Sequence, residues 1–220
     1  MADGAEVLAV EPEVVAVLID DEELSGEEIG RIRTAYWANV RGEIGDVANK
    51  LIVDKFPLNI VVLPLIKRVF PQAKIIFALR DPRDVIFSCF QQRFGMNVAM
   101  VQFLQLNTAA TYYDLVMRLM DACRETLALD LHEVRYEDVV ADLENSARDL
   151  ASFLGIGFEP AMLNYRDTAL RRTIETPSAR QVIQPLYTRS IQRWRRYAPQ
   201  LAPILPILEP WAIRYGYSPA

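Results

Sequence analysis

The stretch from Lys74 to Phe94, KIIFALRDPRDVIFSCFQQRF, decides the fold. Its first part, Ile75 to Leu79, is a short and uninterrupted apolar run, which is the pattern of a parallel strand covered on both faces. The chain then becomes charged, with Asp81 placed to cap a helix and Pro82 at the first helical position. The stretch therefore predicts a buried strand, a sharp turn and a helix.

The turn after this strand predicts an anion site. Open α/β sheets bind ligands beyond the carboxyl ends of their strands, and helix N-termini attract anions. Arg80 lies at that edge. Because helical side chains lean back towards the helix N-terminus, the hydroxyl of Ser88 can reach the same place. Taken alone, the motif is explained equally well by local ion pairs among Arg80, Asp81 and Asp84.

In order and spacing, these residues resemble the sulfotransferase family. The matching positions are Arg80-Asp81-Pro82-Arg83-Asp84 and Ser88, with the first arginine and the serine eight apart. The resemblance implies that Arg80 and Ser88 hold the 3′-phosphate of 3′-phosphoadenosine 5′-phosphosulfate (PAPS), the sulfuryl donor. It also implies an α/β fold with a P-loop-like parallel sheet.

A second strand-end motif contains Lys55. The sequence LIVDKFPLN, residues 51–59, predicts an apolar strand that ends in a charged pair and a proline. Similar sulfotransferases carry a lysine just before such a proline, so the resemblance implies that Lys55 stabilises the transferring sulfuryl group. An ion pair with Asp54 is the plainer alternative. A helix from Leu58 to Phe70 would return the chain to the central strand in a right-handed crossover.

The resemblance also covers a loop near the C-terminus. The segment from Thr173 to Tyr187 has no clear periodicity and predicts a long loop over the site. Within it, residues 176–185 are similar to the loop that closes on PAPS in tyrosylprotein and tetratricopeptide-repeat sulfotransferases. This similarity implies that Ser178 contacts the donor, with Gln181 and Arg180 as companions.

A basic and aromatic cluster follows that loop, at Arg189, Arg193, Trp194, Arg195, Arg196 and Tyr197. In a chain of net charge −5 and pI near 5.1, it predicts a local anion site or surface ion pairs rather than RNA binding. Cytosolic relatives carry Arg-Lys-Gly where this chain has Tyr187-Thr188-Arg189, which makes Arg189 the candidate cofactor contact there. Many relatives carry a glycine where this chain has Gln192.

The family's first strand and its phosphate loop, a Gly-x-Pro-Arg-Ser-Gly-Thr-Thr type of sequence, do not occur in this chain. That loop grips the 5′-phosphosulfate through backbone N–H groups. We therefore expect a single, N-terminally incomplete sulfotransferase domain over residues 1–220, with activity impaired or lost in this chain. Strand edges exposed by the missing strand would favour self-association.

The acidic N-terminal segment, residues 1–28, is the expected source of the base that deprotonates the acceptor. Relatives use an acid or a histidine for this step, and the position that matches the histidine is Lys55. The resemblance therefore implies a glutamate of the segment, for which Glu11 is our candidate. Glu6 and Glu13 are close enough to compete.

The rest of the chain predicts helices and one more strand. Ser25 and Glu28 form a capping-box pattern that begins a helix ending near Val40. Further on we expect a helix at 99–127, a strand at 131–136 and an amphipathic helix that ends at Leu154.

The composition of the chain limits the classes of partner that we expect it to bind. The acidic balance argues against nucleic acid and anionic membranes but allows a local basic pocket. Cys89 and Cys123 have neither metal nor disulfide spacing, which fits a reducing cytoplasm and a site without metal. The apolar run from Val14 to Ile19 is too short to span a membrane.

Two functions from different classes stay open. The first is transfer of a sulfuryl group from PAPS to an acceptor hydroxyl, by a chain most similar to the bacterial tetratricopeptide-repeat sulfotransferases. The second is a degenerate, non-catalytic domain of the same fold, acting as a nucleotide-binding or protein-interaction module. A nucleotide kinase fits less well, because the GxxxxGK[ST] loop that it needs is also missing from the sequence.

Overall fold

The structure, a computed structural model, combines helices with short strands and describes residues 7–8, 24–170, 186 and 188–220. The chain divides into two compact units. The first contains Met1–Ala73 and Arg118–Asp130, and the second contains Lys74–Met117 and Leu131–Ala220. The organisation of residues 1–220 as a single domain stays a prediction.

The first unit contains a small parallel sheet. Strand β1 (Val7–Leu8) pairs in parallel with β2 (Val53–Asp54), and Val7 lies opposite Val53. The sequence predicted β2 as part of a longer strand, whereas β1 lies inside the acidic N-terminal segment, for which no strand was predicted. Two residues are too few to show the alternating pattern by which a strand is recognised.

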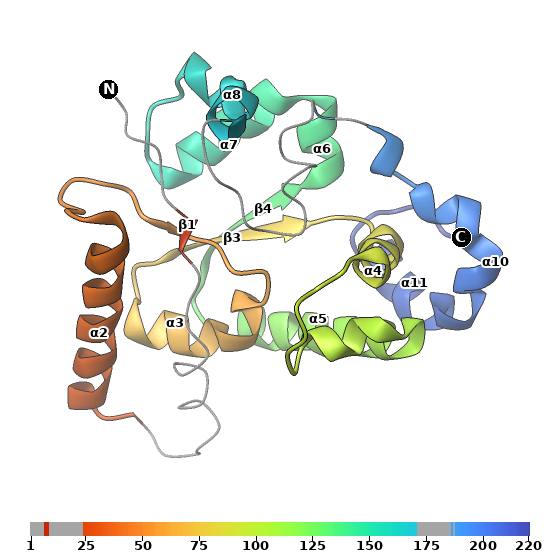
Figure 1. Ribbon diagram of the computed structural model, residues 1–220, viewed down its shortest axis with the longest axis horizontal. Helices are drawn as coiled ribbons and strands as arrows, with labels where there is room; N and C mark the ends of the chain where they lie inside the picture. Colours follow the sequence, from red (N-terminus) through yellow and green to blue (C-terminus); the bar gives the residue numbers. More distant parts are fainter. Residues whose placement is uncertain (1–6, 9–23, 171–185, 187) are drawn as a thin grey trace. The chain divides into compact units, whose positions relative to one another are not determined.

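Helices complete this unit (Figure 1): α2 (Gly26–Ile44), the 3-10 helix η1 (Asn59–Val62) and α3 (Leu63–Val69), with α2 packed against α3. The predicted capping box is confirmed. The backbone N–H of Ser25 donates to Glu28 Oε2 at 2.7 Å, and the Ser25 hydroxyl accepts from the Glu28 N–H at 3.3 Å. The helix runs beyond Val40 to Gly45, which has a φ of +74°.

The second unit is built around the strand, turn and helix that the sequence predicted. Strand β3 (Lys74–Leu79) lies beside β4 (Asp130–Arg135) in a two-stranded sheet (Figure 1), and α4 (Pro82–Gln91) follows β3 directly. Asp81 caps α4 by accepting from the Arg83 N–H at 3.0 Å. Burial of β3 on both faces is wrong for Ile76, which is 37% exposed, because a two-stranded sheet is narrow and leaves its edges near solvent.

The described strands form two separate sheets. Strand β2 pairs with β1, and β3 pairs with β4, so β2 and β3 are not hydrogen-bonded neighbours. The predicted crossover from the first of these strands to the second therefore does not place them side by side within a sheet of the described residues.

Two predicted helices are each divided in the structure. The one expected at 99–127 consists of η2 (Met100–Leu104) and α5 (Leu106–Thr126). The one expected to reach Leu154 consists of α6 (Tyr136–Ala141) and α7 (Leu143–Leu154). Asp142 makes the second break by capping α7, since its carboxylate accepts from the Asn145 N–H at 3.0 Å.

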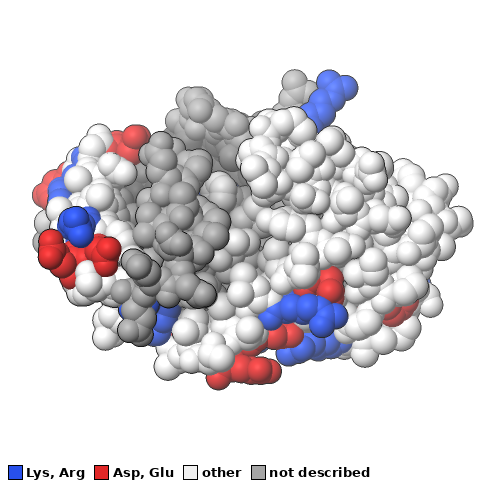
Figure 2. Space-filling model, turned by 90° about the horizontal axis from the view of Figure 1, so that it is seen from below, with Lys and Arg blue, Asp and Glu red and all other residues white. Residues whose placement is uncertain are grey.

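Short helices form the C-terminal part: η3 (Pro160–Asn164), α8 (Tyr165–Leu170), η4 (Thr188–Ser190), η5 (Arg193–Tyr197), α10 (Ala198–Leu201), η6 (Ala202–Ile204) and α11 (Leu205–Arg214). Within the described ranges, none of the helices is both long and apolar enough to cross a membrane. On the face drawn in Figure 2, most lysine and arginine side chains lie beside acidic ones, so its charge is mixed.

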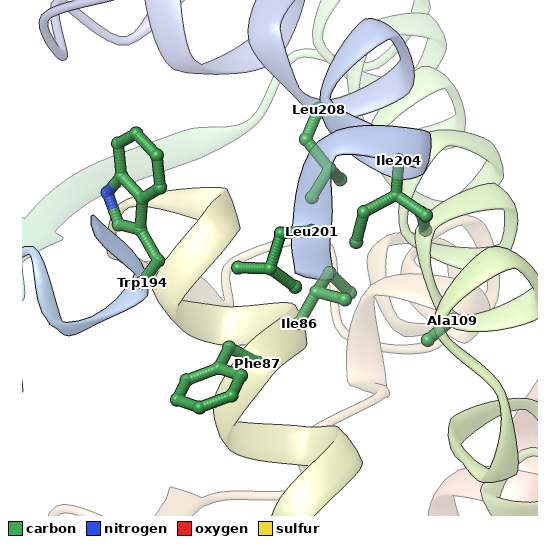
Figure 3. Close-up of a cluster of buried hydrophobic side chains, with 8 residues drawn as sticks. Ile86, Phe87, Ala109, Trp194, Leu201, Ile204 and Leu208 are labelled. Carbon is green, nitrogen blue, oxygen red and sulfur yellow. The ribbon is translucent and has the colours of Figure 1, made fainter. Parts of the chain in front are cut away.

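Helix α4 is the centre of the second unit's core. Its Ile86 and Phe87 pack with Trp194 of η5 and with Leu201, Ile204 and Leu208 from the C-terminal helices (Figure 3). Each such buried side chain contributes about 1.5–3 kcal/mol through removal of apolar surface from water. The core thus holds η5 against α4 and fixes the walls of the pocket described next.

Candidate anion-binding site

A pocket of about 370 Å³ lies between α4 and the segment that contains η4 and η5. Its lining residues are Arg80, Asp84, Phe87, Ser88, Gln91, Gln92, Arg189, Ser190, Arg193 and Arg196. Four arginines against one aspartate make the pocket basic in a chain whose net charge is −5. Arg80, Ser88 and Arg189, three of the residues selected from the sequence, line this one pocket.

A buried ion pair shapes the turn that begins α4. The Nε and Nη2 atoms of Arg83 donate to the two carboxylate oxygens of Asp81 at 2.9 and 2.8 Å, and both residues are at most 2% exposed. Arg83 also donates to the Ser218 carbonyl at 2.9 Å. Its guanidinium lies 4.1 Å from the centre of the Trp194 ring, whose Nε1–H donates to Asp81 at 3.2 Å. This network fixes the backbone next to Arg80.

Arg80 is held at the edge of the pocket. Its Nη2 donates to the Ser190 carbonyl at 2.7 Å, and its guanidinium lies 5.0 Å from the centre of the Tyr136 ring. Its Nε atom is buried and has no hydrogen-bond partner within the described structure. A planar guanidinium with further N–H donors is suited to bind phosphate oxygens in pairs.

Asp84 is the acid of the pocket and is 1% exposed. Its Oδ1 accepts from the Trp194 backbone N–H at 2.8 Å, while its Oδ2 is buried with no hydrogen-bond partner in the described part of the chain. Burial raises the pKa of Asp84 to about 6, although the Trp194 N–H and the charge of Arg80 work in the opposite direction. Through its hydrogen bond with the Trp194 N–H, the Asp84 carboxylate connects α4 to η5.

Ser88 and Cys89 are neighbours on α4, and only the first of the two lines the pocket. Ser88 is half-buried and lines the pocket. Cys89, the next residue, is not among the lining residues, and burial raises the pKa of its thiol to about 11. The thiol is therefore protonated near neutral pH, which argues against a nucleophilic role for Cys89.

Lys55 belongs to the first unit, where it directly follows β2 and is exposed. The alternative ion pair with Asp54 is not formed between these two described side chains. Asp54 instead accepts from the Tyr36 hydroxyl at 3.2 Å and from Asn59 Nδ2 at 3.3 Å. Burial raises the pKa of Asp54, and the two hydrogen bonds oppose that shift.

Comparison with known proteins gives the family. The model described as "Sulfotransferase family" matches residues 18–160, which is more than half of the chain and includes Lys55, Arg80 and Ser88. The chain belongs to the sulfotransferase family.

The chain is similar to proteins from bacteria and from an animal. It is 30% identical over 165 residues to an uncharacterized protein of Aquifex aeolicus (strain VF5), covering 74% of this chain and 21% of that protein. It is 24% identical over 208 residues to protein-tyrosine sulfotransferase 1 of Danio rerio, covering 91% and 58%. It is 29% identical over 114 residues to omega-hydroxy-beta-dihydromenaquinone-9 sulfotransferase Stf3 of Mycobacterium tuberculosis (strain CDC 1551 / Oshkosh), covering 49% and 29%. The chain thus spans between about a fifth and three fifths of the length of these relatives.

Among solved structures, the sulfotransferase domain from the curacin biosynthetic pathway is similar to this chain with a TM-score of 0.49 and 22% sequence identity. The match covers 78% of this chain and 68% of that one.

Several residues selected from the sequence fall outside the described part of this sulfotransferase. These are Glu11 in the N-terminal segment and Ser178, Arg180 and Gln181 in the loop before η4. Their roles stay predictions.

Seven of the ten lining residues were not among the site residues selected from the sequence, and three of these seven are charged: Asp84, Arg193 and Arg196. Arg193 and Arg196 belong to the basic and aromatic cluster, for which the sequence predicted either a local anion site or surface ion pairs. The spacing of the residues in that cluster did not indicate which of them face a pocket. Asp84 was expected to act in local ion pairs. It binds instead a backbone N–H at Trp194, far along the chain.

Proposed function

We propose that this sulfotransferase moves a sulfuryl group from PAPS to the hydroxyl of an acceptor. The observation that carries the proposal is the pocket along α4, where Arg80 and Ser88 meet further arginines in an otherwise acidic chain. Arg80 and Ser88 would hold the 3′-phosphate of the donor, and Arg189 would add a third contact.

Lys55 and a glutamate supply the chemistry of transfer in this proposal. The acceptor oxygen attacks the sulfur, the bond between sulfur and the bridging oxygen breaks, and 3′-phosphoadenosine 5′-phosphate leaves. The ammonium of Lys55 stabilises the negative charge that builds on the bridging oxygen. The acceptor proton goes to a carboxylate, for which Glu11 is the candidate. Ser178 and Gln181 would close over the donor.

Bacterial tetratricopeptide-repeat sulfotransferases are the subfamily that we propose for the chain, whose printed sequence lacks a glycine-rich loop for the 5′-phosphosulfate. Impaired activity of this chain by itself stays a prediction. The names of the relatives suggest two acceptor classes for a first assay, a protein tyrosine and the ω-hydroxyl of a menaquinone. A cytoplasmic location and self-association of the chain stay predictions.

The experiment that tests the donor site is a calorimetric titration of 3′-phosphoadenosine 5′-phosphate into the chain and into Arg80→Ala. We expect binding by the parent and at least a tenfold weaker affinity in the variant, because a charge-assisted pair to phosphate is lost. Arg148→Ala is the matched control, since Arg148 is an exposed arginine on α7 that pairs with Glu144 at 2.6 Å. Equal affinities of Arg80→Ala and the parent would contradict the role of Arg80.

A second candidate function is a nucleotide-binding or protein-interaction module that has lost transfer. This candidate does not need a glycine-rich phosphate loop, which the printed residues do not contain. Transfer of labelled sulfuryl from PAPS to either acceptor class would exclude this candidate. Binding of the nucleotide without any transfer would favour it, and a folded chain that binds no nucleotide would leave only the protein-interaction role.

A further inference from the structure

The connection between α4 and α5 (Figure 1) has an apolar outer surface. Between 46% and 89% of the surface is exposed in four of its side chains, which we call the apolar patch: Met96, Val98, Val101 and Leu104. Together they expose roughly 400 Å² of surface, within the range of about 300–600 Å² for the largest patches on monomers, which are often interaction sites.

The patch belongs to an ordered piece of structure. Asn97 caps η2, because its side-chain oxygen accepts from the N–H groups of Ala99 and Met100 at 3.0 and 2.8 Å. Side chains three residues apart lie on the same face of a 3-10 helix, so Val101 and Leu104 form one ridge.

Aromatic rings hold this connection in place. The centre of the Phe103 ring lies 5.6 Å from that of Phe94 and 6.0 Å from that of Tyr112 in α5. Phe103 also packs against the core that contains Ile86 and Phe87 (Figure 3). The patch therefore keeps its shape before a partner binds, which lowers the entropy lost on association.

Charge indicates which kind of partner suits the patch. Residues 94–113 include no Asp, Glu, Lys or Arg, although charged residues make up 24% of the chain and its net charge is −5. A twofold interface places each group near its own copy, so an uncharged surface is where two acidic chains meet with least repulsion. The exposed amides of Asn97, Gln105 and Asn107 can both donate and accept, which makes this border self-complementary.

The area of the patch also fits a second copy. A specific interface buries at least about 1,200 Å² in total, or about 600 Å² per partner, and homodimer interfaces are about 65% apolar. The patch provides an apolar share of that size, and the neighbouring amides provide polar surface. Peptide segments that lie on membranes carry Lys and Arg beside their apolar face, and residues 94–113 have neither.

We propose that the apolar patch is the interface of a twofold symmetric dimer of this chain. The inference goes beyond the proposed function and does not rest on it. The dimer forms through side chains of the connection between α4 and α5, and not through the edges of strands. Because the area is at the lower end for specific interfaces, the dimer dissociates on dilution.

The test is sedimentation velocity over a range of concentrations, with the parent, Val98→Glu and Leu104→Glu. We expect the parent to change from monomer to dimer between about 1 and 100 μM. Each substitution should weaken dimerisation at least tenfold, because it places a carboxylate near its own copy. Ile213→Glu is the matched control: Ile213 is a 56% exposed apolar residue of α11 in the same unit, and the variant adds the same charge. Urea unfolding of all four proteins shows whether each variant is folded.

The outcomes separate the proposed dimer from its alternatives. Weaker association in both patch variants, with Ile213→Glu like the parent, supports it. A parent that stays monomeric up to about 100 μM would overturn it, as would association that both patch variants retain, which would point to another surface such as a strand edge. Equal weakening by Ile213→Glu would indicate a general effect of charge and would also overturn it. A monomeric parent that binds vesicles of neutral phosphatidylcholine, when Val98→Glu does not, would assign the patch to a lipid surface instead.

Discussion

The ends of β2 and β3 look alike in the sequence and differ in the structure. Each has an apolar run followed by charged residues and a proline. After β3, Asp81, Arg83 and Asp84 are at most 2% exposed and joined to Trp194 and the C-terminal segment. At the end of β2, Lys55 is exposed, and Asp54 accepts hydrogen bonds from Tyr36 and Asn59.

The difference separates charges that stabilise the turn from charges that are available to a ligand. A buried charge is tolerated when it is paired and hydrogen-bonded, as in the fork between Arg83 and Asp81. An exposed ammonium keeps its water and can exchange it for a ligand oxygen. Arg80 and Arg83 lie in the same turn but have different tasks: Arg83 forms the buried fork with Asp81, and Arg80 lines the pocket.

Arg83→Met should give the largest effect. The substitution keeps most of the side-chain volume but leaves the Asp81 carboxylate buried without its fork, which costs about 3–5 kcal/mol of unfolding free energy. Urea unfolding followed by tryptophan fluorescence measures this loss. Arg195→Met is the control, because it removes an exposed arginine that faces the same Trp194 ring and should cost less than about 0.5 kcal/mol. A loss below about 1 kcal/mol in Arg83→Met would refute the structural role of the fork.

Local signals in the sequence predicted the half of the pocket that α4 provides. The apolar run, the Asp81 cap and Pro82 lie within a few residues of one another, so β3 and α4 were predicted close to their observed bounds. Ser88 was predicted to reach the region of Arg80 because helical side chains lean back towards the helix N-terminus. The capping box of Ser25 was predicted for the same reason.

Long-range contacts determine the half of the pocket that η4 and η5 provide. Asp84 meets Trp194, and Arg80 meets Ser190, across a separation of 110 residues in each case. The spacing of arginines along the chain does not show which of them will face a pocket. That depends on contacts with distant residues, such as the hydrogen bond between Asp84 and the Trp194 N–H. The same limit explains β1, whose two residues are defined by their partner strand and not by a pattern of their own.

Lys55→Ala should change activity and leave stability almost unaltered, in contrast to Arg83→Met. If Lys55 stabilises charge on the bridging oxygen, its removal lowers the rate of sulfuryl transfer about 100-fold. Unfolding free energy should change by less than about 0.5 kcal/mol, because the side chain is exposed. Initial rates with labelled PAPS and urea unfolding measure the two quantities. Lys50→Ala, an exposed lysine of the same unit, is the control, and equal rates for both variants would remove Lys55 from the mechanism.

Asp84→Asn should change the way in which the free energy of unfolding depends on pH. Burial raises the folded-state pKa of Asp84 to about 6, above its ordinary value of 3.8, so between these values the folded protein holds a proton that the unfolded chain has lost. Rising pH therefore destabilises the parent across this window and then has no further effect through this group. The asparagine keeps an oxygen for the Trp194 N–H and cannot ionise.

The measured quantity is the difference in unfolding free energy between Asp84→Asn and the parent. It should grow by about 2–3 kcal/mol in favour of the variant from about pH 4 to about pH 7. At the other strand end, Asp54→Asn should give a smaller change of the same sign, since burial raises the pKa of Asp54 as well. A difference for Asp84→Asn that is constant with pH would show that the carboxylate is not protonated in that window.

Gln192→Gly should give the smallest effect and a stabilising one. Gln192, which precedes η5, has a φ of +55°, a left-handed conformation that costs a residue with a Cβ about 1–2 kcal/mol. Glycine removes that cost but loses more entropy on folding, which leaves a gain of about 0.5–1 kcal/mol. Asn49, at a φ of +61° in the other unit, is the matched position, and Asn49→Gly should gain less because asparagine tolerates this region better. Urea unfolding of both variants measures the difference. Equal stability of Gln192→Gly and the parent would mean that the backbone before η5 holds no strain at this residue.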